Sequence, residues 1–245
     1  MSSRFAASKA AINAAITLTA VQRLRARLDG DASLVKALLV GLLTVLLLLA
    51  FVLGGAEVME GDTHSFDVYL LQGAQSLRAG HPWLAAIMRD FSALGSTAVM
   101  TLFTLISVGY LTLVSARVTA LLVAMSVITG AVFVQILKAG FGRLRPDAGF
   151  ADLVATGLSF PSGHTSMSAI VFLTLGALIA STRSRVPERL YILAAAALLA
   201  LLVGVSRVLL GVHWATDVLG GWAFGAAWAM AWLLLARFLR QDPQG

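Results

Sequence analysis

Six long runs of apolar residues, none with a charged side chain, alternate with polar segments along the 245-residue chain. The runs cover residues 37–56, 91–116, 118–137, 165–182, 190–206 and 218–236. A membrane-spanning helix needs about 20 mostly apolar residues, which is close to the length of these runs. A large soluble helical protein is the alternative, but its helices would keep one polar face, whereas these runs are apolar all round. The pattern therefore predicts an all-α fold, a bundle of six transmembrane helices that forms a single domain over residues 34–240.

The connection between the first two runs, residues 57–90, carries a weaker apolar pattern. Apolar side chains recur at helical spacing in its middle: Phe66, Leu70, Leu71, Ala74 and Leu77. Trp83 follows Pro82, and tryptophan is typical of the region near lipid headgroups. We expect a short helix that lies in the membrane interface between spans one and two. Two roles stay open for this helix: a lid over loop backbone, or a wall that guides a lipid toward a site.

Charged residues make up 12% of the chain, about half the usual share of a soluble domain. With six crossings, twelve of the 18 Lys and Arg residues fall on the side of the two termini, and eight of the 12 Asp and Glu residues fall opposite. Because loops rich in Lys and Arg stay in the cytoplasm, we expect both termini there. Membrane topology thus explains the net charge of +6, and no nucleic-acid partner is expected.

Residues 1–33 form a separate, basic and cytoplasmic segment in this interpretation. Residues 8–28 fit either a basic helix on the membrane surface or a disordered basic tail. They do not fit a signal peptide, because Arg23, Arg25 and Arg27 occupy the place of a small-residue cleavage site. The chain has no cysteine, which excludes disulfides and thiolate metal sites.

Three polar clusters interrupt the apolar pattern: KAGFGRLRP at 138–146, SFPSGH at 159–164 and SRVLLGVHWATD at 206–217. With six crossings, all three lie on the same, non-cytoplasmic side of the membrane. Converging cations repel each other unless an anion sits among them. Arginine offers a planar fork for phosphate oxygens and lysine a point charge, so Lys138, Arg145 and Arg207 predict a phosphate-like anion.

The second cluster supports the same anion site. Ser162 is a candidate N-cap of the following helix, and Gly163 allows close approach of the backbone. Their N–H groups would face the anion, with the positive end of a helix dipole behind them.

His213 and Asp217, four residues apart, are the candidate reacting pair. If the last helix begins near Gly211, the two side chains share one helical face. Asp217 would then accept the Nδ1 proton and leave Nε2 free as a nucleophile. His164, from another span, is a candidate general acid. A lone His–Asp pair at this spacing is more often structural, but three clusters on one membrane face together favour phosphoryl chemistry.

The three clusters resemble the motifs of the type 2 phosphatidic acid phosphatase superfamily, which read K-x6-RP, PSGH and SR-x5-H-x3-D. All three match without a substitution, and the six-span layout also matches. The resemblance implies that His213 attacks phosphorus to form a phosphohistidine and that Asp217 orients it. His164 would protonate the leaving oxygen and then help water to hydrolyse the intermediate. The residues that hold the phosphate oxygens would be Lys138, Arg145, Ser162, Gly163 and Arg207.

The same resemblance implies chemistry without a metal or another cofactor. Asp147 and Asp152, the remaining acids nearby, are expected to be solvated loop residues. Arg143 lies inside the first motif without defining it, and we expect it to be a peripheral charge. His64 and His81 receive no role.

The function implied by the resemblance is that of an integral membrane phosphatase for lipid phosphates or diphosphates. We expect a bacterial plasma (inner) membrane, with the active site on the periplasmic or external face and the lipid tail among apolar side chains. Candidate substrates are phosphatidic acid, phosphatidylglycerol phosphate, undecaprenyl diphosphate and lipid A phosphates. Two alternatives stay open: a lipid phosphotransferase that uses the same intermediate, and a non-catalytic lipid phosphate transporter. A binding protein needs no nucleophile, so the intact histidines argue against the transporter.

Overall fold

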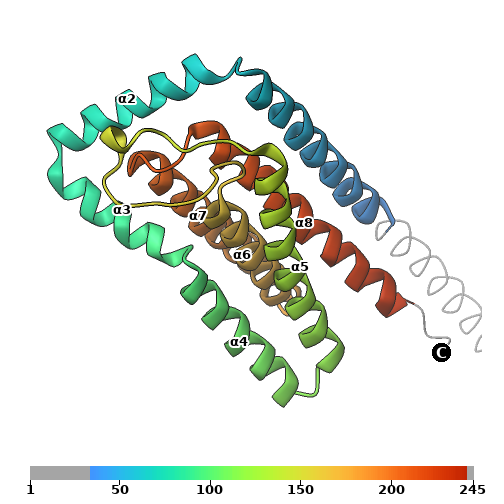
Figure 1. Ribbon diagram of the computed structural model, residues 1–245. Coiled ribbons are helices and arrows are strands. Elements are labelled where there is room, and N and C mark those ends of the chain that lie inside the picture. The colour runs from blue at the N-terminus through green and yellow to red at the C-terminus, as the bar shows by residue number, and fades with distance from the viewer. Residues whose placement is uncertain (1–33, 242–245) are drawn as a thin grey trace, which may run out of the picture. The chain divides into compact units, whose positions relative to one another are not determined.

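The computed structural model describes residues 34–241, and this part of the chain is all helical, as predicted, without a strand (Figure 1). The helices are Leu34–Glu60, α2 (His64–Gly80), α3 (Pro82–Leu94), α4 (Thr97–Leu113), α5 (Arg117–Phe141), α6 (Gly163–Ser181), α7 (Val186–Leu209) and α8 (Ala215–Gln241). A short 3₁₀ helix, η1 (Ala148–Phe150), lies in the long loop between α5 and α6. The predicted basic helix at 8–28 lies outside the described residues.

Within residues 34–241, five helices are long and apolar enough to cross a membrane: Leu34–Glu60, α5, α6, α7 and α8. The remaining predicted span is a broken one, formed by α3 and α4 with a bend of 42° between them. The apolar run at 91–116 therefore begins inside α3 rather than at a helix end. When the bent pair counts as one crossing, the protein has the six expected spans and is an integral membrane protein.

The break between α3 and α4 falls at Gly95 and Ser96. The Ser96 hydroxyl accepts the Val99 N–H at 3.4 Å and so caps the start of α4. Gly95 is tightly packed, because a Cβ there would lie 2.4 Å from Val203 Cγ1 and 3.3 Å from His164 Cβ. The bend thus lets the chain pass close to His164, a predicted site residue.

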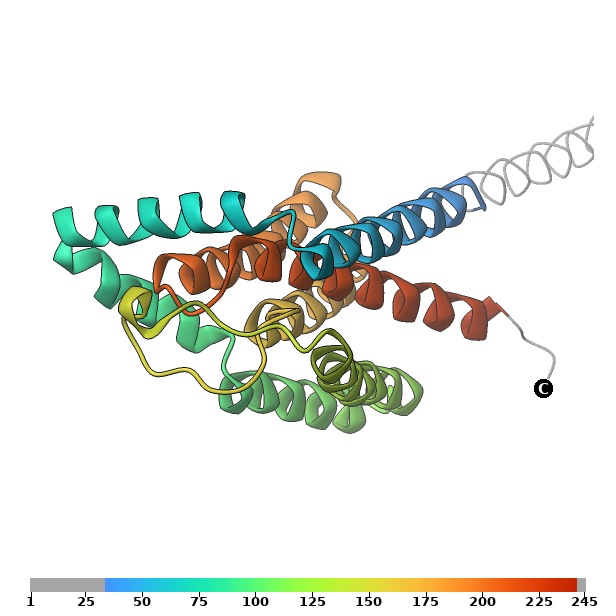
Figure 2. The ribbon, with the colours of Figure 1, turned by 45° about the horizontal axis from the view of Figure 1, so that its top comes forward.

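Helix α6 packs against α4, α5, α7 and α8, and both ribbon views show it between these neighbours (Figures 1 and 2). Small residues permit this close packing, as is common between membrane helices. A Cβ at Gly225 of α8 would lie 2.6 Å from Ser166 O of α6, and a Cβ at Gly176 of α6 would lie 2.6 Å from Ala196 Cβ of α7. This packing brings the start of α8, which carries Asp217, beside the start of α6.

The segment at 57–90, predicted to be interfacial, is helical: it contains α2 and most of α3, and α3 is also the first part of the broken span. Its apolar stripe is only partly buried: Leu71 and Ala74 are buried, whereas Phe66 is exposed. Helix α2 is tied to the loop between α5 and α6, since Arg78 Nη2 donates to Phe150 O at 2.6 Å. Figures 1 and 2 accordingly show η1 beside the α2–α3 pair.

Candidate active site

Residues from all three polar clusters line one cavity of about 570 Å³. Its polar end is lined by Lys138, Arg145, Gly163, His164 and His213. The rest is lined mostly by apolar side chains of two helices, among them Met100, Leu105 and Val108 of α4 and Val127, Ile128 and Ala131 of α5. No residue of the segment 57–90, all of which the structure describes, lines this cavity, so α2 is not one of its walls.

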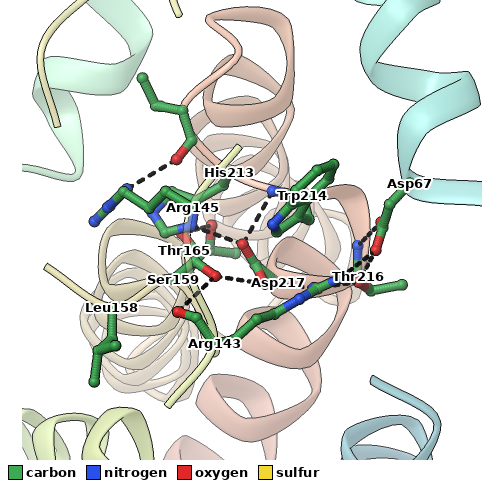
Figure 3. Close-up of polar contacts among 12 residues, drawn as sticks. Asp67, Arg143, Arg145, Leu158, Ser159, Thr165, His213, Trp214, Thr216 and Asp217 are labelled. Atoms are coloured by element: carbon green, nitrogen blue, oxygen red, sulfur yellow. Dashed lines mark hydrogen bonds and ion pairs between the residues drawn. The ribbon is translucent and has the colours of Figure 1, made fainter. Parts of the chain in front are cut away.

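His213 is buried and hydrogen-bonded through both ring nitrogens (Figure 3). Nε2 lies 3.0 Å from Arg145 Nη1, and Nδ1 lies 3.1 Å from Asp217 Oδ2. A guanidinium can only donate, so Nε2 is the acceptor and Nδ1 carries the proton that Asp217 receives. Burial, followed by the charges of Arg145 and Arg207, lowers the pKa of His213 well below its ordinary value. The ring is therefore neutral at neutral pH, with its Nε2 lone pair at the polar end of the cavity.

The His213–Asp217 contact does not arise from a shared helical face, which corrects the sequence interpretation. Helix α8 begins at Ala215, after a turn in which Gly211 has a φ of +72°. Asp217 lies in the first turn of α8, and its Oδ2 also accepts the Trp214 N–H at 3.0 Å, as in a capping box. The helix start thereby fixes the carboxylate that contacts the imidazole.

Lys138 and Arg145 are held by backbone carbonyl groups of the loop before α6. Lys138 Nζ donates to Leu158 O at 2.6 Å, and Arg145 Nε donates to Gly157 O at 3.0 Å. Arg145 Nη1 also donates to Val212 O at 2.8 Å. Carbonyl groups orient a cation without neutralising it, so both side chains keep their positive charge beside the cavity.

Arg207 of α7 is buried, whereas Lys138 and Arg145 are half-buried, and the Arg207 guanidinium is only partly satisfied. Its Nη1 donates to the Ser92 hydroxyl of α3 at 2.6 Å, while its Nε has no partner among the described residues. Within residues 34–241, no carboxylate lies within ion-pair distance of Lys138, Arg145 or Arg207. Buried cations without a counter-charge are unfavourable, and an anion in the cavity would offset this penalty.

The hydrogen bonds of Ser162 differ from those expected at an anion site, whereas Gly163 lies at the cavity. Ser162 occupies the N-cap position of α6, but its hydroxyl makes no capping bond and instead accepts from Thr165 Oγ1 at 3.0 Å. Its amide donates to Asp217 O at 3.0 Å and is therefore not free for an anion. Gly163 does line the cavity, and a Cβ there would lie 3.6 Å from Lys138 Cε.

A model of the PAP2 superfamily matches residues 119–241, which include all three motifs. The chain belongs to the PAP2 superfamily. Phosphatidylglycerophosphatase B of Bacillus subtilis is 34% identical over 188 residues, or 74% of this chain and 88% of that protein. Lipid A 1-phosphatase of Porphyromonas gingivalis is 35% identical over 108 residues, but these are 44% of this chain and only 22% of that protein.

Two solved structures share this fold, and one of them is of a PAP2-type protein. The transmembrane PAP2-type phosphatidylglycerolphosphate phosphatase from Bacillus subtilis superposes with a TM-score of 0.71 at 29% identity, covering 82% of this chain and 98% of that one. LpxE of Aquifex aeolicus gives a TM-score of 0.52 at 24% identity over 68% of this chain and 93% of that one, and supports the fold alone.

Arg143 was expected to be peripheral, and this expectation is wrong. Its Nη1 donates to Asp217 Oδ1 at 2.7 Å, and its Nη2 donates to Asp67 Oδ2 at 2.6 Å (Figure 3). Both carboxylates are fully buried, and the Arg143 side chain is only 14% exposed. Arg143 occupies a variable position of the motif K-x6-RP, two residues before Arg145, so the motif assigned it no role. Asp67 was missed because it stands in a connecting segment outside all PAP2 motifs.

The other titratable residues near the PAP2 motifs make no metal site. No group of three or more His, Asp or Glu side chains within residues 34–241 has the geometry to hold a metal ion. Asp152, expected to be solvated, pairs with Arg89 at 2.8 Å, and its side chain is 23% exposed. The ring of His64 contacts Trp214 with centroids 5.7 Å apart, and His81 stays outside the cavity lining.

Proposed function

We propose that this protein hydrolyses the terminal phosphate monoester of a glycerophospholipid, with phosphatidylglycerol phosphate as the first candidate substrate. PAP2 membership and phosphatase relatives make the protein a membrane lipid phosphatase. The choice of substrate rests on the relative that matches most of both chains, a phosphatidylglycerophosphatase. The observation that carries the proposal is the unprotonated Nε2 of His213, on which the charges of Arg145, Arg207 and Lys138 act, while none of these three cations has a carboxylate within ion-pair distance among residues 34–241.

The proposed reaction begins when Arg145 Nη1 turns from His213 Nε2 to a non-bridging phosphate oxygen, which frees the Nε2 lone pair for in-line attack on phosphorus. The Nε2–P bond forms as the bond from phosphorus to the lipid oxygen breaks, and His164 gives that oxygen its proton. Asp217 stabilises the positive charge that develops on the imidazole through the Nδ1–H bond. A water molecule then attacks the phosphohistidine with His164 as base, and phosphate and neutral His213 are released.

Lys138, Arg145 and Arg207 would stabilise the charge on the non-bridging oxygens during both steps. Phosphoryl transfer is mainly a matter of positioning and charge stabilisation, and these cations are already oriented by carbonyl and hydroxyl groups. The Nε of Arg207 supplies a donor that is otherwise unsatisfied. Gly163 would let the phosphate approach the start of α6, while Ser162 would support the site from behind.

The cavity between α4 and α5 suits one tail of a lipid whose phosphate sits at His213. Its polar end holds the candidate catalytic residues, and its apolar lining continues along both helices. A substrate in this position would keep its tail at membrane depth during the reaction. The distribution of Lys and Arg residues favours cytoplasmic termini, which would place this polar end on the periplasmic or external face.

The experiment is phosphate release by purified protein in detergent with EDTA. The substrates are phosphatidylglycerol phosphate, phosphatidic acid, undecaprenyl diphosphate and lipid A, each assayed with and without an acceptor lipid. We expect free phosphate without acceptor, at the highest kcat/KM for phosphatidylglycerol phosphate. Release only with an acceptor would establish a phosphotransferase instead, and binding of all four lipids without turnover would establish a transporter. Preference for lipid A would assign the activity of the Porphyromonas gingivalis relative.

A further inference from the structure

A buried carboxylate outside the PAP2 motifs is directly connected to the candidate catalytic pair. Asp67 lies in the first turn of α2 and is fully buried. Its Oδ1 accepts the Thr216 N–H at 2.9 Å, and its Oδ2 accepts the Thr216 hydroxyl and Arg143 Nη2, both at 2.6 Å. The three hydrogen bonds connect α2 both to the first turn of α8 and to Arg143.

Arg143 carries this connection to Asp217. The guanidinium bridges the two buried carboxylates, since Nη2 donates to Asp67 and Nη1 donates to Asp217 Oδ1 at 2.7 Å (Figure 3). The same Nη1 also donates to the Thr216 hydroxyl at 2.7 Å, so Thr216 joins the network from the first turn of α8. A planar fork held at both ends has one available orientation.

The two carboxylate oxygens of Asp217 contact different partners, and one of them contacts the candidate nucleophile. Oδ1 accepts from Arg143, which leaves Oδ2 directed at His213 Nδ1 at 3.1 Å. The Trp214 N–H on Oδ2 and the Ser159 hydroxyl on Oδ1 also hold this carboxylate, but Arg143 makes its shortest bond and is an ionic partner. A displaced Arg143 would therefore loosen the direction of the carboxylate and of the imidazole that it contacts. Asp67 holds the opposite side of Arg143 in place.

We propose that Asp67 is a positioning residue for the reaction, which acts through Arg143 on the carboxylate of Asp217. The inference rests on the proposed role of His213 as nucleophile. It also gives α2 a function other than lid or wall: the helix supplies one end of the network that orients the catalytic pair. Asp67 has no contact with the cavity, so the phosphate-binding cations stay in place without it.

The test compares Asp67→Asn with Asp62→Asn, a neighbouring carboxylate that is exposed and outside the network. We expect Asp67→Asn to lower kcat for phosphate release about 10- to 100-fold, the size of effect that follows when a group orienting a functional side chain is removed. KM and inhibition by vanadate should change less than about twofold. Asp62→Asn should leave all three unchanged. Loss of vanadate binding together with kcat would mean that Asp67 only maintains the fold.

A double-mutant cycle shows whether Asp67 acts through Asp217. We expect Asp67→Asn to change kcat by less than about twofold in an Asp217→Asn background, because the carboxylate that it positions is already gone. An undiminished effect in that background would overturn the inference. If Asp67→Asn does not fold, Thr216→Val tests the same network, and unchanged kcat in Thr216→Val would count against it. Unchanged kcat in Asp217→Asn and His213→Ala would instead reject the proposed function itself.

Discussion

Replacement of Arg143 by glutamine is the most informative perturbation of this structure. The substitution removes the only cation within ion-pair distance of both Asp67 and Asp217 in the described part of the chain. Both carboxylates are fully buried and would have to remain charged without the guanidinium counter-charge, with only neutral hydrogen-bond donors left, or take up a proton. The change therefore tests stability and catalysis together.

The expected loss of stability follows from the burial of the network. Breaking a buried ion pair costs about 3–5 kcal/mol, because the remaining charge is left uncompensated. For a protein of this size, about 1 kcal/mol corresponds to a shift of about 2–4 °C in the unfolding midpoint. We therefore expect Arg143→Gln to lower the midpoint in detergent by about 6–20 °C. Vanadate at saturating concentration should recover part of this loss, because it binds only the folded protein.

The expected loss of activity follows from the bond between Arg143 Nη1 and Asp217 Oδ1. A hydrogen bond to a charged group contributes about 1.5–3 kcal/mol. If the whole bond supports the transition state, its removal slows phosphate release by about 10- to 150-fold. Phosphate release should be measured well below the lowered midpoint, so that unfolding does not contribute.

Arg89→Gln is the matched control, because Arg89 also pairs with a carboxylate but is more than half exposed. Surface ion pairs contribute little, so its midpoint and kcat should stay near those of the unchanged protein. The reasoning is refuted if Arg143→Gln behaves like this control. Arg143→Lys should recover part of the stability but little of the activity, because an ammonium group does not offer the fork that contacts both carboxylates.

Three further outcomes follow from the site. His213→Ala should abolish phosphate release while leaving vanadate binding measurable, and retained turnover would exclude His213 as nucleophile. Lys138→Ala and Arg207→Ala should weaken inhibition by vanadate at least about tenfold, since a lost charge-assisted bond contributes about 1.5–3 kcal/mol; unchanged inhibition would reject the anion site. The lowered pKa of His213 keeps Nε2 unprotonated as pH falls below about 6.5, so kcat/KM should decline only in more acidic buffer. Over that range the unfolded chain binds a proton that the folded site excludes, so the unfolding midpoint should fall with pH.

The bundle and the meeting of three distant clusters were predictable from the sequence. Apolar runs of membrane length indicate a transmembrane helix regardless of its neighbours, and six crossings put all three polar clusters on one side of the membrane. The residue at which α8 begins was not predictable from the sequence. A helix from Gly211 would have explained the His213–Asp217 spacing, but Gly211 has a φ of +72°, which is not helical, and a Cβ there would lie 1.9 Å from Phe150 O, so only glycine fits this turn.

The role of Arg143 was not predictable for a different reason. The string RLRP offers two arginines two residues apart, and their chemistry is identical until their neighbours are known. Those neighbours come from α2 and from the loop before α6, neither of which has a sequence pattern that shows which polar residue is buried. Asp67 stands among exposed residues such as Asp62 and His64, and only the packing of α2 against α8 separates it from them.

The two arginines of RLRP show how one site can hold several cations and still leave charge for a substrate. Arg143 is neutralised by two buried carboxylates, so it can orient Asp217 without competing for phosphate. Arg145 is held by carbonyl oxygens alone and retains its charge beside His213 Nε2. If Asp67 were absent, Arg143 would still pair with Asp217 at 2.7 Å and would stay outside the cavity lining, so phosphate binding should persist. The loss would fall on the second end of the guanidinium fork, which fixes the direction of the Asp217 carboxylate and through it that of the imidazole.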